Sequence, residues 1–551
     1  MIDPITLEVT RNKLDCIAEE MEWTLLSASF SPIVKEGLDA SASLFLADGS
    51  TLAQACAVPI HLGSLIPSVA NILRTFPLHT MEQGDLYCMN DPYAGGTHAP
   101  DITVVMPIFH GGRVMALAAT MTHHQDIGGM SPGSLPPDAT DVFQEGMRLP
   151  ALRLMHGDKY NDTLLKIMFN NVRTPETLMG DLSAQVAACK TGAQRVQEVL
   201  ERLGAEEFDL IARTLLDRSE ELTRRSLMEL PSGTYRSVDF LDNDGVELDK
   251  PVRIEVAVTL KDGTIHFDMT GTSPQVRGPF NCVPSGAQSA AYFAIRALTE
   301  SSIPTNAGCF RPVTLHLPEK SLVNPTSPAA VNARAIPVKT LTTNMLAALA
   351  EAAPHRVPAF NSNLHLLAFG GVKPDGSHYI VSEMVSGGMG AHARGDGNSV
   401  TEGDISNCMN MPCEALELDY PVRVLETEFR MDSGGRGKWR GGLGCRREYL
   451  ILADNVTLTH RGDHHRQGPR GILGGESGGK AHSYIVRTSG DIEVIPSKAI
   501  RRLQKGDRLV VETPGGGGYG SFTERDPSIV QDDIANLKTS QHIIEKSVTG
   551  L

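Results

Sequence analysis

The stretch that decides the fold is NDPYAGGTHAPDITVVMPIFHGGRVMALAATMTHHQDIGG, residues 90–129. Two apolar runs, residues 102–109 and 114–120, stand on either side of the turn sequence His110-Gly-Gly-Arg113. Apolar runs joined by a Gly-Gly turn are typical of a β-hairpin, because glycine readily adopts the positive φ angles of such a turn. The stretch therefore predicts two antiparallel strands with polar residues beyond their open end.

The open end of this hairpin gathers residues that can bind a metal. Folding the chain about the two glycines places Asp101 opposite Thr122, with His123 next to it. His98 lies just before the first strand, and Asp126 follows the second strand closely. Two imidazoles with one or two carboxylates suit Zn²⁺, Mn²⁺ or Fe²⁺. The spacing favours such a site over a plain polar network.

The neighbouring residues narrow the choice of ligands. His124 adjoins His123, and successive side chains of an extended chain point in opposite directions, so we expect only one of the two to bind the metal. Glycine pairs at 95–96 and 128–129 let the backbone approach a bound species closely. We therefore expect His98, Asp101 and His123 to form the centre and His124 to face away.

A second predicted hairpin repeats the arrangement. Strands at 41–47 and 51–58 flank the turn Asp48-Gly49, and folding about this turn brings Asp39 near His61. Taken singly, Asp39 is typical of a turn and His61 of a hydrogen-bonded core histidine. Either one can complete a four-ligand shell. A carboxylate fits the ligand set better than a third imidazole.

The whole chain indicates a mixed α+β fold with a helix-rich N-terminal part. Asp3 can cap a helix with Pro4 at its first position, and a second helical region extends over about 175–227. From about residue 233 apolar and polar residues alternate as in half-buried strands, with one clear helix near 340–352. We expect strands at 253–260, 264–270, 423–430 and 448–452.

This change of pattern predicts three regions. Residues 1–230 are expected to form the metal-binding catalytic region with its β-hairpins. Residues 231–520 are expected to form a strand-rich and glycine-rich region with one inserted helix, which packs against the first region and contacts a partner. Residues 521–551 form a C-terminal tail.

The composition is that of a globular protein and excludes some partners. The net charge of −15 argues against nucleic acid or an anionic membrane as partner. No apolar stretch approaches the roughly 18 residues that span a bilayer, and the start of the chain predicts no export signal. Nine cysteines without CxxC spacing indicate reduced thiols. We therefore expect a cytoplasmic protein.

Two glycine-rich segments resemble nucleotide-binding loops but lack essential features. GGESGGKA, residues 474–481, has the spacing of a phosphate loop, but Ala481 stands where a metal-binding Ser or Thr belongs, and a strand-like segment follows. Residues 514–520 contain no lysine, so a structural turn is the better interpretation. We also expect His464-His465 to lie in a solvated loop.

The motifs resemble one protein family along nearly the whole chain. The sequence is similar to hydantoinase B/oxoprolinase subunits, and the matching stretches are 3–8, 19–21, 58–63, 90–101, 123–134, 144–146, 173–175, 180–185, 306–312, 432–435, 440–444 and 514–520. The resemblance implies a divalent metal held by Asp39, His98, Asp101 and His123. It also implies a hydantoinase A-like ATPase partner, which carries ATP and Mg²⁺ in an (αβ)₂ complex.

The resemblance further implies ATP-dependent opening of a small cyclic amide, such as hydantoin, 5-oxoproline or caprolactam. The partner would phosphorylate the carbonyl oxygen, and the metal would supply hydroxide to the activated intermediate. Asp126 is the leading candidate for a catalytic base or for a residue that supports a ligand imidazole. Glu36 and Glu145 are weaker candidates.

Two other functions stay open from the sequence. One is a subunit of an ATP-dependent ketone carboxylase of the acetone or acetophenone type, and the other is a non-catalytic scaffold for the ATPase. The chain departs from the family pattern at Ala40, where an aromatic residue is usual, and in the tail after Gly520. The first departure would reshape the pocket beside Asp39.

Overall fold

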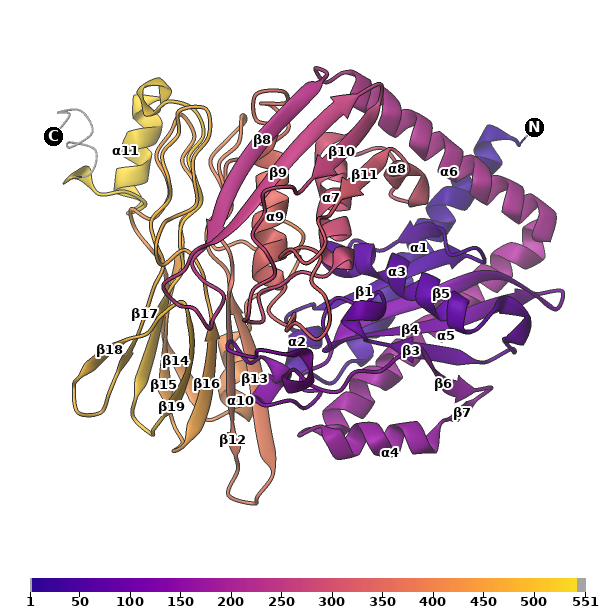
Figure 1. Ribbon diagram of the computed structural model, residues 1–551, viewed down its shortest axis with the longest axis horizontal. Helices are drawn as coiled ribbons and strands as arrows, with labels where there is room; N and C mark the ends of the chain where they lie inside the picture. Colours follow the sequence, from indigo (N-terminus) through magenta and orange to yellow (C-terminus); the bar gives the residue numbers. More distant parts are fainter. Residues whose placement is uncertain (1, 543–551) are drawn as a thin grey trace.

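The two predicted metal-bearing hairpins are neighbours in a seven-stranded antiparallel sheet, one in its middle and the other at one edge (Figure 1). The computed structural model describes residues 2–542. The strand order is β2-β1-β5-β4-β3-β6-β7. The strands are β1 Ala40–Leu46, β2 Thr51–Gln54, β3 Leu86–Met89, β4 Asp101–His110, β5 Arg113–His123, β6 Leu152–His156 and β7 Lys159–Tyr160.

Helices cover both faces of this sheet. α1 (Pro4–Ala28) packs on α5 (Pro175–Leu203), and α5 lies across β4 and β5. α3 (Pro59–Thr75) packs against the opposite face. The side chain of Asp3 caps α1 as predicted, since it accepts the N–H of Thr6 at 2.9 Å.

The second predicted helical region is two helices. Gly204, with a φ of 78°, separates α5 from α6 (Ala205–Met228). α6 leads into a four-stranded sheet in the order β11-β10-β9-β8, in which β10 and β11 are parallel. Its strands are β8 Gly233–Leu241, β9 Val252–Lys261, β10 Thr264–Asp268 and β11 Val313–His316.

The prediction of one inserted helix after residue 230 is wrong. The predicted helix is α9 (Ala335–Ala348), which packs on β8 and β9, but α7 (Pro284–Leu298) lies between α9 and α3. Much of the buried face of α7 is built from alanine, serine and glycine, so its apolar periodicity is weak in the sequence. Two short helices, α8 (Ala307–Phe310) and α10 (Cys413–Asp419), are also present.

The last third of the chain forms two facing sheets with a common apolar core. One has the order β13-β12-β16-β19 and the other β14-β15-β20-β17-β18. The predicted strands at 423–430 and 448–452 correspond to β14 and β15. The bounds are β12 His365–Val372, β13 His378–Val385, β14 Val422–Phe429, β15 Cys445–Ile451, β16 Val456–Arg461, β17 His482–Val486, β18 Ile492–Val494, β19 Lys498–Leu503 and β20 Arg508–Glu512.

Four glycine-rich segments pack backbone against backbone beside these sheets. They are residues 387–397, 433–444, 468–479 and 514–518, and we call them the glycine layer. The N–H of Gly388 donates to the carbonyl of Pro514 at 3.0 Å, and that of Gly435 to the carbonyl of Gly516 at 2.9 Å. A Cβ on Gly516 would lie only 1.9 Å from the carbonyl oxygen of Met389. These segments therefore serve a structural purpose.

The remaining elements complete the outer surface. After residue 520 the chain forms α11 (Pro527–Ala535), where Asp533 binds Arg525 at 2.6 Å, and residues 543–551 of the predicted tail lie outside the described part. α2 (Pro32–Lys35) and α4 (Asp162–Asn171) pack beside the first sheet. Short 3₁₀ turns occur at Leu78–Thr80, Pro92–Ala94, Pro132–Ser134, Val142–Gln144 and Phe522–Glu524.

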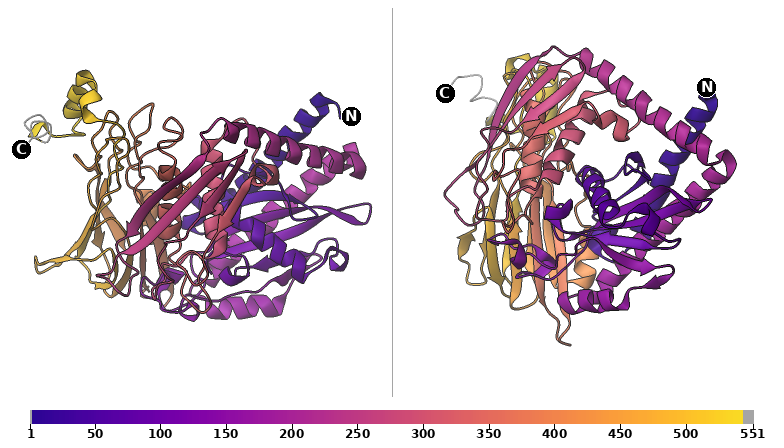
Figure 2. Two further views of the ribbon diagram at one scale, coloured as in Figure 1. Left: turned by 45° about the horizontal axis from the view of Figure 1, so that its top comes forward. Right: turned by 45° about the vertical axis from the view of Figure 1, so that its right-hand side comes forward.

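The N-terminal sheet and the C-terminal sheets lie on opposite sides of the molecule, as all views show (Figure 2). The largest apolar cluster nevertheless joins residues from Leu7 to Tyr519, so the predicted regions share one core. The predicted boundary near residue 230 coincides with the step from α6 to β8. None of the helices within residues 2–542 is long and apolar enough to cross a membrane.

Candidate metal centre

The hairpin of β4 and β5 forms the first part of the centre. Asp101 pairs directly with His123 across the two strands. The predicted register, with Asp101 opposite Thr122, is therefore wrong by one residue. A β-bulge between Ile108 and Phe109 causes the shift, because a bulge adds one residue to one strand. The shift brings the predicted ligands closer together.

The second hairpin delivers Asp39 to the same place. β1 runs antiparallel to β5, and the N–H of His123 donates to the carbonyl of Asp39 at 3.1 Å. The second strand is shorter than predicted, since β2 ends at Gln54. Pro59 then starts α3, as proline favours the first turn of a helix. That first turn carries His61 into the centre.

Three imidazoles and two carboxylates meet here. His98 Nε2 lies 2.7 Å from Asp101 Oδ1, and His123 Nδ1 lies 3.2 Å from both atoms. His61 Nε2 lies 3.4 Å from Asp39 Oδ1 and 3.5 Å from Asp101 Oδ2. His123 Nδ1 is 3.9 Å from Asp39 Oδ2. Asp39 and His61, which the sequence left as alternatives, therefore both face the cluster.

Other polar groups orient the buried ligand atoms. The ring Nδ1 of His98 lies 2.9 Å from the carbonyl of Asn332. Arg334 Nη2 donates to Asp101 Oδ2 at 2.5 Å and lies 3.1 Å from His98 Nε2. The hydroxyl of Thr97 also donates to Asp101 Oδ2. These contacts fix both the carboxylate and the imidazole plane.

Burial and neighbouring charges set the protonation states. Burial lowers the pKa of His98 to about 4, and the positive charge of Arg334 acts in the same direction. Burial raises the pKa of Asp101, but its interactions with His98, Arg334 and His61 outweigh burial and hold the pKa well below the usual value. Burial lowers the pKa of His61, whereas Asp101 and Asp39 raise it by more. The centre thus pairs an ionised Asp101 with a neutral His98.

This donor set fits a divalent cation. With its Nδ1–H donated to the Asn332 carbonyl, neutral His98 directs the Nε2 lone pair at the Asp101 carboxylate only 2.7 Å away. Two lone pairs at this distance repel unless a positive charge lies beside them, as Arg334 does here with Nη2 3.1 Å from His98 Nε2, and a bound cation would act in the same way. Both nitrogens of the buried His61 lack a hydrogen bond within the described part of the chain. Imidazole and carboxylate donors are the ligands of Zn²⁺, Mn²⁺ and Fe²⁺ sites.

The other candidates from the sequence lie outside the cluster. The ring Nε2 of His124 lies 3.0 Å from Gln185 Oε1, so this imidazole faces α5 as its alternation with His123 predicted. Glu36 is half-buried at the end of α2 and does not line the cavity described below. Its catalytic role stays a prediction without support from its position.

Asp126 organises a loop. Its carboxylate accepts the N–H groups of Gly128 at 3.0 Å, Gly133 at 3.1 Å and Arg173 at 3.0 Å. The guanidinium of Arg173 adds an ion pair at 2.9 Å. Within residues 2–542 the structure gives Asp126 no hydrogen bond to an imidazole. Its predicted role as base or support of a ligand is untested, and its contacts favour a structural role.

Glu145 supports the segment that orients His98. Its carboxyl oxygens accept the N–H of Val331 at 2.9 Å and that of Asn332 at 2.7 Å. Burial raises its pKa to about 7, although the two backbone donors and Arg461 act in the opposite direction. Glu145 therefore acts through Asn332, whose carbonyl faces the imidazole of His98.

A cavity opens beside the cluster. Asp39, His98 and His123 contribute to its wall, together with the basic residues Arg334, Lys339 and Arg461. The rest of the wall is mostly apolar, and includes Ile33, Val58, Ile60, Leu135, Leu364, Leu366, Met384 and Ile405. A mostly apolar cavity with a few convergent polar groups is the usual form of a small-molecule site.

The sequence did not predict the arginines or Asn332. Arg461 Nη2 lies 3.2 Å from Asn332 Oδ1 and 3.1 Å from the carbonyl of Pro136, and its side chain is buried. Arg334 and Asn332 precede α9, far from the hairpins in sequence. No spacing rule relates them to the ligands, and the only weak signal is two polar residues, Asn332 and Arg334, within an apolar segment.

Comparison with known proteins identifies the family. The family model described as hydantoinase B/oxoprolinase matches residues 3–522. The caprolactamase subunit beta of Pseudomonas jessenii is 29% identical and aligns over 97% of this chain and 94% of its own length.

Solved structures agree with this result. The crystal structure of the ATP-dependent caprolactamase from Pseudomonas jessenii superposes with a TM-score of 0.91, at 29% identity, over 98% of this chain and 95% of that chain. A nucleotide-free acetone carboxylase structure also gives a TM-score of 0.91, at 22% identity, over 98% of this chain and 79% of that chain. The second match shows a common fold. The chain belongs to the hydantoinase B/oxoprolinase family.

Proposed function

We propose that this chain is the metal-binding, ring-opening subunit of a heteromeric ATP-dependent amidohydrolase. Its substrate would be a small cyclic amide such as hydantoin, 5-oxoproline or a lactam. The partner would be a hydantoinase A-like ATPase that carries ATP and Mg²⁺ in an (αβ)₂ complex. The observation that carries the proposal is the meeting of imidazoles, carboxylates and two buried arginines at one cavity.

The overall reaction needs activation of an unreactive carbonyl. ATP on the partner would phosphorylate the carbonyl oxygen of the ring amide. One water then opens the ring C–N bond, with a proton passing to the nitrogen, and a second water frees the phosphate. The products are the open-chain acid, ADP and phosphate. An ion held by Asp39, His98, Asp101 and His123, with Zn²⁺ as first choice, would supply hydroxide near neutral pH.

The cavity suits an activated, anionic intermediate. Guanidinium groups bind phosphate oxygens through paired hydrogen bonds, and Arg334 and Arg461 both line the wall. The Nε atoms of both side chains are buried without a hydrogen bond in the described part of the protein. Apolar residues such as Ile60 and Leu364 would exclude bulk water, which otherwise destroys the intermediate.

ATP binding is assigned to the partner. The segment 474–481 runs into β17, so it lacks the helix whose N-terminus holds phosphates in a phosphate loop. Isothermal titration of the isolated chain with ATP-Mg should therefore give no heat of binding. A micromolar ATP site on this chain would contradict the division of labour.

Reconstitution tests the proposal directly. The chain alone should not open hydantoin, 5-oxoproline or caprolactam, and it should do so with its ATPase partner and ATP-Mg. Product acid and ADP should appear together. Robust turnover by the lone chain would overturn the proposal. Consumption of acetone or acetophenone that depends on bicarbonate, without ring opening, would favour the carboxylase alternative instead.

A further inference from the structure

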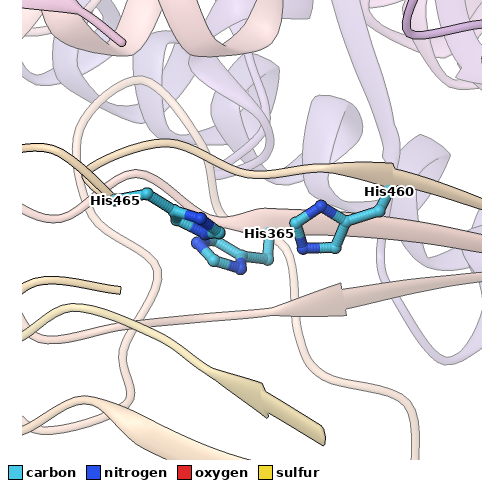
Figure 3. A group of neighbouring side chains, drawn as sticks. All are labelled: His365, His460 and His465. Atoms are coloured by element: carbon cyan, nitrogen blue, oxygen red, sulfur yellow. The ribbon is translucent and has the colours of Figure 1, made fainter. Parts of the chain in front are cut away.

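A second cluster of histidines lies in the C-terminal half, and its two strand residues face the side of β12 and β16 opposite to Leu366 and Arg461, which line the cavity. His365, His460 and His465 each place a ring nitrogen within 4.8 Å of those of the other two (Figure 3). Their ring centroids are 5.4, 5.5 and 5.9 Å apart. His365 and His460 are fully buried, and His465 is half-buried. The predicted solvated loop at His464-His465 is therefore wrong, since His464 is buried as well.

The strand pairing places the first two imidazoles on one face of a sheet. His460 on β16 pairs with Leu367 on β12, and His365 precedes Leu367 by two positions on the same face. Gly462 makes room for the His365 ring, because a Cβ on Gly462 would lie within 3.0 Å of three of its ring atoms. The sheet therefore fixes both rings before the third residue joins them.

The loop after β16 brings His465 to the pair. His464 has a φ of 63°, which reverses the chain, and the N–H of His465 donates to Asp242 Oδ2 at 2.8 Å. Asp463 binds Lys498 at 3.0 Å, and both side chains are buried. This ion pair neutralises the lysine that lies closest to the imidazoles. A bound cation would therefore meet no uncompensated positive charge from it.

Each of these imidazoles has a ring nitrogen that makes no hydrogen bond within the described residues and is free to bind a metal. His460 Nε2 lies 3.0 Å from the hydroxyl of Ser483, and His365 Nε2 lies 3.4 Å from the carbonyl of Asp463. His365 Nδ1, His460 Nδ1 and His465 Nε2 have no hydrogen bond within residues 2–542. Buried ring nitrogens without a partner are unfavourable in a packed core. A metal-binding histidine uses one nitrogen as ligand and the other as a hydrogen-bond donor, which is the pattern of His365 and His460.

We propose that His365, His460 and His465 form a second metal site, which binds Zn²⁺ or another late first-row divalent cation through three neutral imidazoles. Such cations prefer imidazole, and a site with three histidines leaves a fourth position open. A surface groove lined by His465, His482 and Ser497 reaches the cluster. Water or a small anion can occupy the open position from this groove.

Metal content of the full-length chain tests this site. Chelator-treated protein is reloaded with Zn²⁺, freed of excess by gel filtration and analysed by inductively coupled plasma mass spectrometry. Wild type should hold one equivalent more than His365→Ala and His465→Gln. His482→Gln is the matched control, because His482 lies in the same groove outside the cluster, and it should keep the wild-type content. Unchanged zinc content in both cluster variants would overturn the proposal.

A second experiment avoids loss of a ligand and separates the two sites. Gly462→Ala keeps all three histidines but displaces the His365 ring, so it should also lose one equivalent of zinc.

A separate experiment adds Co²⁺ to Asp101→Asn protein, in which the first centre is disabled. The visible absorption bands of imidazole-bound Co²⁺ should persist there and disappear in Asp101→Asn/His465→Gln. Bands that already vanish in Asp101→Asn would assign all metal to the first centre. Circular dichroism checks the fold of each variant.

Discussion

The two histidine clusters of this chain differ in their partners. In the first, His98, His123 and His61 share their space with two carboxylates, and Arg334 binds the same Asp101. The second cluster offers imidazoles alone, since the buried carboxylate of Asp463 is paired to Lys498 and that of Asp242 accepts the backbone N–H of His465. The first cluster is suited to catalysis, because its metal ligands and charged side chains lie beside one cavity. The second suits coordination by imidazole alone, at the ends of the two inner strands β12 and β16.

Loss of a ligand from the first cluster should have the largest effect. In His123→Ala, bound metal should fall by one equivalent and ring opening by the reconstituted pair by more than about 100-fold, beyond the usual cost of losing a residue that merely supports a ligand. ATP binding by the partner should survive. His365→Ala should leave ring opening within a few-fold of wild type. Elemental analysis and product chromatography measure both.

His124→Asn is the control for this contrast. It removes an adjacent buried imidazole that contacts Gln185 and not the cluster. The variant should retain its metal. Metal retained in His123→Ala but lost in His124→Asn would contradict the observed register of β5.

The next-largest loss of activity is expected from substitution of Glu145, which supports the first cluster and not the second. Glu145→Ala should lower ring opening by about 10–100-fold, because the segment that orients His98 loses its two hydrogen bonds. Glu145→Gln keeps an acceptor oxygen and should restore most of the activity. Equal losses in both variants would assign a catalytic proton to Glu145.

The two clusters should also differ in the divalent cation that each binds most tightly. Carboxylates favour Mn²⁺, whereas imidazoles favour Zn²⁺, Cu²⁺ and Ni²⁺. Electron paramagnetic resonance titration should show one tight Mn²⁺ per chain, lost in Asp101→Asn and kept in His365→Ala. Tight Mn²⁺ binding that survives in Asp101→Asn and depends on His365 would reverse this assignment.

The smallest expected effect is a change of the protein's thermal stability with pH, which is caused by Glu22 near the first cluster. Burial raises the pKa of Glu22 to about 8, from about 4.3 in an unfolded chain. The protonated carboxyl then stabilises the fold fully below about pH 4, and this contribution is lost as the pH rises through about 8. The Tm should fall by a few degrees between pH 5 and pH 8, and by less in Glu22→Gln. Calorimetry in matched buffers measures both slopes.

The first centre could largely be predicted because most of its residues lie close together in the sequence. A short turn separates β4 from β5, so spacing alone brought His98, Asp101 and His123 together. The α+β class and the main strands followed in the same way from periodicity. The register was missed because a bulge near Ile108 leaves no mark in the sequence. The helix α7 was missed because small residues hide its buried face.

The rest of the site depends on contacts that sequence spacing does not contain. Arg334 and Arg461 reach the cavity through the packing of α9 and β16, two elements distant from the hairpins. His365 meets His460 because β12 pairs with β16. His465 joins them because Asp242, directly after β8, accepts the N–H of His465 and holds its loop. Long-range pairing of this kind appears only in the folded chain.

The glycine layer has a consequence for how the chain reaches its native state. Its segments have few side chains to bury, so they gain little from early collapse, and their amides find partners only across long stretches of sequence. During synthesis, Gly388 and Gly435 must wait for residues 514–518, which leave the ribosome later. Until then their backbone groups stay solvated. Closure of the layer therefore follows the synthesis of all four segments, and it is a late step in the folding of this part of the chain.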